Sequence, residues 1–255
     1  MENASGGVQS VARIFSIIEI LSEHPKGISL QDVANESGLP KSTAHRLLSS
    51  LITLGYAVQD SFTTHYRLTL KMFELSSGIV NDMDILMVAR PHLDRLARQS
   101  GETVHLVIQD GIDVVYLYKA EAGQSMRMSS RVGRRIPMYC TGVGKAILAT
   151  QSYGEAERVW QKSKIQRLTQ NTVVDFENFI EQLKQVRLAG YATDDEENEL
   201  GIRCVALSLP AISGRAEAAF SISGLAPHMD DTRLTELSRM ALETKQAILR
   251  DLGWR

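Results

Sequence analysis

The chain is poor in cysteine and has no long hydrophobic run. Only two of its 255 residues are cysteines, Cys140 and Cys204, too few for a disulfide-stabilised secreted scaffold. The two thiols could form one bridge, but such a low count is more typical of a reducing compartment. The apolar runs fall short of the ~20 residues that span a bilayer, and the polar N-terminus lacks the apolar core of a signal peptide. We therefore expect a cytoplasmic protein with no membrane association.

The chain also lacks an excess of positive charge and the common enzyme motifs. The net charge of −2 argues against a protein that coats nucleic acid or a membrane surface. The sequence has no Walker loop, no dinucleotide fingerprint and no nucleophile elbow. Its six histidines share no metal-ligand spacing with the cysteines. We therefore expect no metal and no cofactor, in a chain long enough for a small domain and a larger one.

Residues 28–56 predict two helices joined by a tight turn, a pattern typical of DNA-reading helix-turn-helix motifs. Ser29 and Asp32 have the spacing of a capping box at the start of the first helix. Gly38 can end that helix in a left-handed conformation, and Pro40 fits the first turn of the second helix.

The second helix has one apolar and one polar face. Its core face is predicted to consist of Ala44, Leu47, Leu48, Leu51 and Leu54. Two short strands, residues 56–59 and 65–68, then predict a hairpin wing in which His65 or Arg67 could contact a phosphate. Side chains that could donate to phosphates and base edges are predicted to be Lys41, Ser42, Thr43, His45, Arg46 and Arg67.

The alternative interpretation of this region is an ordinary helical hairpin that binds nothing. Through residue 70 there are five Lys and Arg residues against six acidic ones, so the region is not basic overall. Attraction to DNA phosphates must then come from local clusters of basic side chains and from the presence of two DNA-binding sites in a dimer.

The rest of the chain predicts a linker and a larger α+β domain. A first helix is expected over residues 8–23, with Val11, Ile14, Phe15, Ile18 and Leu21 on its apolar stripe. The predicted domains are a winged helix-turn-helix at 8–70, a linker helix at 71–82 and a second domain at 83–253. In that domain, a hairpin turning at residues 110–111 and later strands that pair consecutively favour an antiparallel sheet covered by helices. Strands are expected at 103–109, 113–119, 126–130, 202–209 and 217–223, and helices at 85–99, 142–150, 175–188 and 230–251.

Three segments of this domain could form a ligand site. Gly142 and Val143 open a helix whose free N–H groups favour an anion. Asp194 begins an acidic run, and Cys204 lies on a predicted strand. Ser221 and Ser223 are two residues apart and so face the same side of their strand. These groups could bind a small carboxylate or hydroxy acid, with Met126, Met128 and Met138 as apolar walls.

Each of these features could also have a purely structural explanation. Glycine at a helix start can be purely steric, and the acidic run at 194–199 can be a solvated turn. Four arginines at 127, 131, 134 and 135 could meet an anionic ligand, but such a cluster is more often a solvated loop or a subunit contact. Cys204 and His105 could act as nucleophile and base only if the fold brought them together.

Taken together, the motifs resemble the isocitrate lyase regulator (IclR) family of bacterial transcription regulators. The resemblance covers residues 8–253 and implies a winged helix joined by a helical linker to a GAF-like effector domain. It further implies homodimers or homotetramers on palindromic operators in double-stranded DNA, and a pocket for a small organic acid. The resemblance implies that the ligand contacts of the family correspond here to the backbone N–H groups of Gly142 and Val143 and to the side chains of Asp194, Cys204, Ser221 and Ser223. The matching segments are 8–13, 38–43, 46–48, 131–133, Pro137, 142–146, 190–191, Asp194, Glu197 and 204–206.

We therefore predict a ligand-responsive repressor of a carbohydrate or organic-acid catabolic operon. Residues 126–135 are similar to family members that control ketodeoxygluconate and related sugar-acid catabolism. The alternatives are a small-molecule-binding module or cysteine-dependent enzyme with an incidental helix-turn-helix, and an architectural protein that binds DNA without sequence preference.

Overall fold

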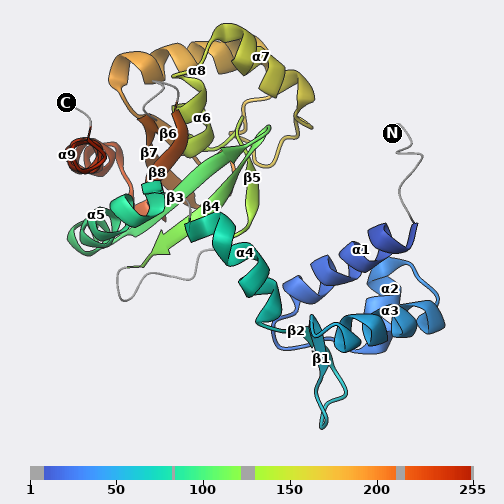
Figure 1. Cartoon of the computed structure of the whole chain (residues 1–255). Coiled ribbons are helices and arrows are strands. Elements are labelled where there is room, and N and C mark those ends of the chain that lie inside the picture. Colours follow the sequence, from blue (N-terminus) through green and yellow to red (C-terminus); the bar gives the residue numbers. More distant parts are fainter. Residues whose placement is uncertain (1–8, 82–83, 122–129, 211–215, 254–255) are drawn as a thin grey trace. The chain divides into compact units, whose positions relative to one another are not determined.

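The computed structural model describes residues 9–81, 84–121, 130–210 and 216–253 (Figure 1). The chain separates into two compact units, residues 1–82 and 83–255. No helix within the described ranges is long and apolar enough to cross a membrane. Two predictions, Met126 and Met128, together with most of the strand expected at 126–130, lie outside the described residues.

The first unit is a three-helix motif with a two-stranded wing and a further helix. Ser29 caps the second helix, since its hydroxyl accepts the N–H of Asp32 at 3.2 Å. Gly38 ends that helix with φ of +65°, as predicted. Pro40 was predicted inside the next helix but lies just before it, as its N-cap. The elements are α1 (Gln9–Glu23), α2 (Leu30–Ser37), α3 (Lys41–Thr53), β1 (Ala57–Gln59), β2 (Tyr66–Leu68) and α4 (Lys71–Asn81).

The core of the first unit corrects the predicted apolar faces of two helices. On α1 the buried residues are Ile17 and Leu21, whereas Val11 and Phe15 are 52% and 57% exposed. The predicted stripe was therefore rotated relative to the face that packs. Leu54 is also exposed, because α3 ends before it and the chain turns away. The residues that do form this core are Ile17, Leu21, Ile28, Val33, Ala34, Ala44, Leu47, Leu48, Leu51, Ala57 and Tyr66.

The second unit contains an antiparallel six-stranded sheet with the strand order β5-β4-β3-β8-β7-β6. One face packs against α5 and α9, and the other against α6, α7 and α8 (Figure 1). The strands are β3 (Thr103–Asp110), β4 (Asp113–Ala120), β5 (Arg135–Pro137), β6 (Ala192–Asp195), β7 (Ile202–Pro210) and β8 (Ala216–Leu225). The helices are α5 (Asp84–Ser100), α6 (Gly142–Leu148), α7 (Tyr153–Lys162), α8 (Phe176–Ala189), the 3-10 turn η1 (Ala226–His228) and α9 (Asp231–Asp251).

The predicted α+β class, with an N-terminal winged helix-turn-helix and an antiparallel sheet in the C-terminal domain, is confirmed. The sequence did not predict four elements: the edge strands β5 and β6, of three and four residues, the helix α7 and the 3-10 turn η1. The hairpin turn also lies one residue later than expected. Asp110 pairs with Asp113, and Gly111 supplies the positive φ of +69° that the turn needs.

Candidate functional site

In the first unit, α3 presents a polar face to solvent while its other face is buried. Lys41, Ser42, His45 and Arg46 are exposed, and Thr43 is half-buried. Because Pro40 gives no side-chain cap, the first N–H groups of α3 are left for solvent or for a phosphate oxygen. The predicted contact residues of α3 therefore share a surface that could enter a major groove.

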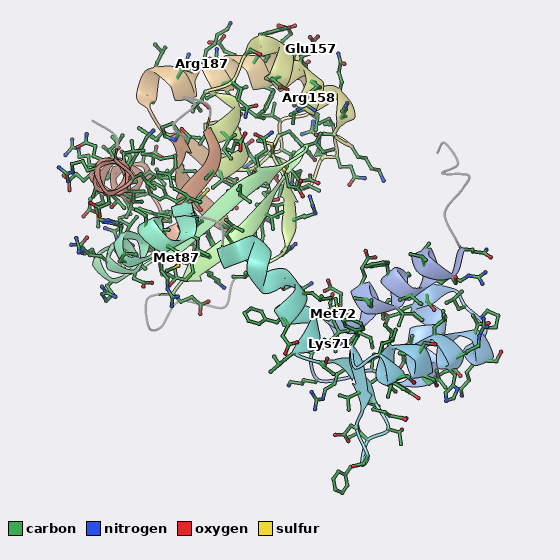
Figure 2. All side chains as sticks on the ribbon, in the orientation of Figure 1. Lys71, Met72, Met87, Glu157, Arg158 and Arg187 are labelled. Atoms are coloured by element: carbon green, nitrogen blue, oxygen red, sulfur yellow. The ribbon has the colours of Figure 1, made fainter. Side chains whose placement is uncertain are left out.

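The start of α4 is tied to the end of α3. Lys71, labelled in Figure 2, donates from Nζ to the carbonyl oxygen of Leu54 at 2.8 Å. The same ammonium lies 4.8 Å from the ring centroid of Tyr56, within cation–π range. On the wing, Arg67 is exposed on β2. The start of α4 is thus held against the residues that join α3 to the wing.

The second unit contains a pocket between the sheet and the start of α6. It has about 550 Å³ of empty space, part of it open to solvent. The predicted ligand residues Gly142, Val143, Asp194, Cys204, Ser221 and Ser223 all line it. Whether they contact a ligand stays a prediction. The other lining residues are His105, Tyr116, Ser130, Arg134, Ile136, Thr141, Asn198, Glu199 and Ile202.

Strand register explains why these side chains meet. Asp194 on β6 pairs with Cys204 on β7, and Cys204 pairs with Ser223 on β8, so the three lie in one row across the sheet. In the next row Ser221 pairs with His105 on β3. Directly paired residues point to the same face of a sheet, so both rows face the pocket.

A chain of hydrogen bonds runs along the pocket wall. His105 Nε2 lies 2.8 Å from Ser130 Oγ, and its Nδ1 lies 3.4 Å from Ser223 Oγ. Ser223 Oγ in turn lies 3.3 Å from Ser221 Oγ. Burial, followed by the nearby Lys119 ammonium, lowers the pKa of His105 to about 3. The imidazole is therefore neutral, and donates through one nitrogen and accepts through the other.

Asp194 is a buried carboxyl with an abnormal pKa. Its Oδ1 accepts the N–H of Glu197 at 2.8 Å. Burial raises its pKa to about 7, although the Lys145 ammonium opposes the shift. At neutral pH this carboxyl is thus close to half-protonated, and in its protonated form it can donate to an anionic ligand.

The start of α6 is packed too tightly for anything larger than glycine. A Cβ on Gly142 would lie 2.9 Å from Cys204 Sγ, and one on Gly144 would lie 2.3 Å from the Cα of Met138. The steric interpretation of these glycines therefore accounts for both.

Comparison with known proteins decides the family. Residues 77–250 match the model described as "Bacterial transcriptional regulator IclR C-terminal", and residues 10–61 match the "IclR helix-turn-helix domain". The chain belongs to the IclR family. It is therefore a DNA-binding transcription regulator with an effector-binding domain rather than an enzyme.

Relatives match over nearly the full length. The chain is 32% identical to the "HTH-type transcriptional regulator KdgR" of Escherichia coli, over 100% of this chain and 96% of that protein. It is 34% identical to the "DNA-binding transcriptional repressor YiaJ" of Escherichia coli, over 97% and 89%. The crystal structure of Thermotoga maritima IclR superposes with a TM-score of 0.82 at 30% identity, covering 96% of this chain and 99% of that one.

The thiols are unlike those of a cysteine-dependent enzyme, in agreement with membership of the IclR family. Cys140 and Cys204 are buried and unbridged. Burial, followed by the Asp194 charge, raises the pKa of both thiols, so the reactive thiolate is disfavoured. His105 lines the same pocket as Cys204 but hydrogen-bonds to serines. Among the residues that the structure describes, no three His, Cys, Asp or Glu side chains are grouped so that they could hold a metal ion.

The predicted arginine cluster does not act as a unit. Arg134 lines the pocket, whereas Arg135 pairs with Asp110 at the β3–β4 turn. Arg131 is exposed, and Arg127 lies outside the described residues. Contact with an anionic ligand therefore stays a prediction for Arg134, which lines the pocket.

Behind the pocket lies an ion pair that the sequence analysis missed. Lys145 Nζ is 2.5 Å from Glu197 Oε1, and both side chains are nearly fully buried. Lys145 also donates to Gln182 at 3.3 Å. Glu197 belongs to the acidic run, so this run is not a solvated turn throughout: Asp194 and Glu197 point inward, while Asp195 and Glu199 are exposed. The inward side chain of Glu197 could not be distinguished from sequence, because this residue follows β6 in an irregular turn, which has no fixed period.

Proposed function

We propose that this IclR-family protein is a cytoplasmic repressor of a carbohydrate or organic-acid catabolic operon. A small keto or sugar acid bound in the pocket of the second unit would change its affinity for a palindromic operator. The observation that carries the proposal is the combination of two sites in one chain: an exposed polar face on a recognition helix and a pocket lined by paired rows of polar side chains.

The polarity of the pocket supports an acid that also carries hydroxyl or keto groups. Arg134 provides a positive charge at the wall, and the serine and histidine chain provides donors and acceptors for hydroxyl groups. A purely apolar ligand would displace water from these polar groups without offering them a further hydrogen bond.

Repression is supported by relatives whose names include the word repressor, such as YiaJ. A homodimer is supported by exposed apolar side chains on α1 and α4, which a second copy of the chain could cover. They are Val11, Phe15, Phe73 and Leu75, each more than half exposed. A dimer would also double the phosphate contacts of a unit that is not basic overall.

Sequence-specific DNA binding can be tested by in vitro selection of DNA sites with the purified protein at fixed moderate salt. We expect enrichment of one inverted repeat, whose half-sites reflect the two-fold symmetry of a dimer. Arg46→Ala should weaken binding to that repeat by roughly ten-fold or more, the value of one lost base or phosphate contact. Arg158→Ala, a substitution on α7 in the second unit (Figure 2), is the control and should bind like wild type.

Two results would contradict the proposal. If the folded protein enriches no DNA site, it does not recognise a specific operator. If Arg46→Ala binds the operator with wild-type affinity, α3 is not the recognition helix.

A further inference from the structure

The tip of the wing carries an aromatic side chain that the fold does not bury. Phe62 is 95% exposed, the highest value among the exposed large hydrophobic residues of the described chain. A phenylalanine contributes ~1.5–3 kcal/mol when it is buried, and here that contribution is absent. Phe62 therefore adds little to the stability of the monomer, and its ring is available to a partner.

The turn that carries Phe62 is held firmly. Asp60 Oδ1 accepts the N–H of Phe62 at 3.0 Å and the N–H of Thr63 at 2.8 Å. The N–H of Thr64, a residue with φ of +60°, donates to the carbonyl of Asp60 at 2.9 Å. The hydrogen bond from Thr63 is the largest cause of the lowered pKa of Asp60, which stays ionised and keeps the turn closed.

The same hydrogen bonds limit what the tip can offer to DNA. The N–H groups of Phe62 and Thr63 point to Asp60 and so cannot donate to a phosphate. The wing contains a single Lys or Arg, Arg67, which lies on β2 and not in the turn. The exposed ring of Phe62 is the largest group that the tip presents, and a ring suits stacked bases better than phosphate oxygens.

The wing is anchored to the recognition helix. The N–H of Tyr56 donates to the carbonyl of Leu51 at 2.8 Å, and Thr69 Oγ1 donates to the carbonyl of Gly55 at 2.6 Å. When α3 lies in a major groove, the wing is therefore carried to the flanking DNA as part of the same rigid unit. An element next to a recognition helix can reach the adjacent minor groove.

We propose that Phe62 is an apolar wedge that enters the minor groove beside each operator half-site, partly unstacks one base step and bends the DNA. This inference rests on the operator binding proposed above. It adds that the protein selects operators partly by how easily the flanking DNA can be bent at the position of Phe62. Pyrimidine–purine steps at the wedge position would then be preferred without any hydrogen bond to a base.

The test uses the full-length protein and the selected operator, with 2-aminopurine placed at successive flanking steps. Wild type should raise the fluorescence of one step in each half-site and bend the DNA by at least ~20° per wedge, measured by gel mobility of permuted fragments. Phe62→Ala should lose the fluorescence signal and most of the bend, and should bind roughly ten-fold more weakly.

Two further substitutions separate a wedge from a general contact. Phe62→Leu keeps an apolar wedge and should retain most of the bend. Phe62→Arg should recover affinity through phosphates but not the fluorescence signal, because a charged side chain does not unstack bases in this way. The control is Leu188→Ala on α8, another highly exposed apolar residue, at 82%. It should behave like wild type.

The outcomes distinguish the wedge from the proposed function. If Phe62→Ala bends and binds the operator like wild type, the wedge is wrong while operator binding stands. If Phe62→Arg gives the wild-type fluorescence signal, the apolar mechanism is wrong. If no operator can be selected, both proposals are contradicted.

Discussion

Replacing Asp194 with asparagine should change the pH dependence of stability in the second unit. The pKa of Asp194 is about 7 in the folded protein and 3.8 in an ordinary aspartate. Between pH 3.8 and pH 7, this carboxyl is therefore protonated in the folded state and ionised in the unfolded state. Because the folded state binds more protons, its stability falls as the pH rises through this range. At ~1.4 kcal/mol per pH unit, the loss amounts to about 4 kcal/mol, of which about 3 kcal/mol falls between pH 5 and 8.

His105, in the same pocket, has the opposite effect. Its pKa is about 3 in the folded protein against 6.5 for an ordinary histidine. Its contribution to stability is complete above pH 6.5 and is lost as the pH falls toward 3. Between pH 6.5 and 5 that loss is about 2 kcal/mol. The two groups therefore partly compensate in the wild-type protein.

The free energy of unfolding should be measured by urea titration from pH 5 to 8, followed by tryptophan fluorescence. Both tryptophans, at positions 160 and 254, belong to the second unit. The ring of Trp160 lies 4.8 Å from the ring of Phe179 and reports on the packing of this unit. Relative to Asp194→Asn, wild type should lose about 3 kcal/mol as the pH rises through this range. Relative to His105→Asn, wild type should lose about 2 kcal/mol as the pH falls from 6.5 to 5. Parallel pH profiles for wild type and Asp194→Asn would show that the pKa of Asp194 is not raised in the folded protein.

Three further predictions concern packing, charge and thiol reactivity in the second unit. Gly144→Ala should destabilise it by ~3 kcal/mol or more in the same urea assay, because its Cβ would overlap backbone. The control Gly154→Ala has open space and should be neutral or slightly stabilising. Lys145→Met should cost ~3–5 kcal/mol at pH 7 by leaving Glu197 buried and unpaired. Adding Glu197→Gln should recover much of that loss, and failure to recover any of it would contradict the role of charge. Cys204 should resist iodoacetamide at pH 8 in the native state, whereas rapid alkylation there would contradict its raised pKa.

The fold could be predicted wherever a local rule operates. The caps of α2 and the turn at Gly38 follow from residue types with a strong positional preference. The edge strands β5 and β6 could not be found, because three or four residues carry too little alternation to stand out from a loop. Val11 and Phe15 look like core residues on a helical wheel, but the wheel alone does not show which side of α1 faces α2 and α3.

The candidate site could be predicted in part. Ser221 and Ser223 share a face because strands have a period of two, and this inference needed no tertiary information. The hydrogen bonds that join His105 to Ser130 and Ser223 depend on the register between β3 and β8 and on a loop 25 residues away. The wing was predicted from its strands, but the exposure of Phe62 depends on the hydrogen bonds of Asp60 within the turn.

A ligand bound in the pocket of the second unit is expected to change the affinity of the protein for its operator. The most direct measurement is the Kd for the selected operator, by fluorescence anisotropy, with and without ketodeoxygluconate and a panel of related keto and sugar acids. One acid should change the Kd of wild type by ~5–150-fold, the usual range of allosteric coupling. Ser221→Ala should bind operator like wild type but need at least roughly ten-fold more of that acid, because a hydrogen-bonding group of the pocket is lost. Ser208→Ala, a buried serine on β7 outside this pocket, should respond like wild type. An unchanged Kd with every acid would contradict regulation by a ligand of this class, and an equal response of Ser221→Ala and wild type would contradict binding in this pocket.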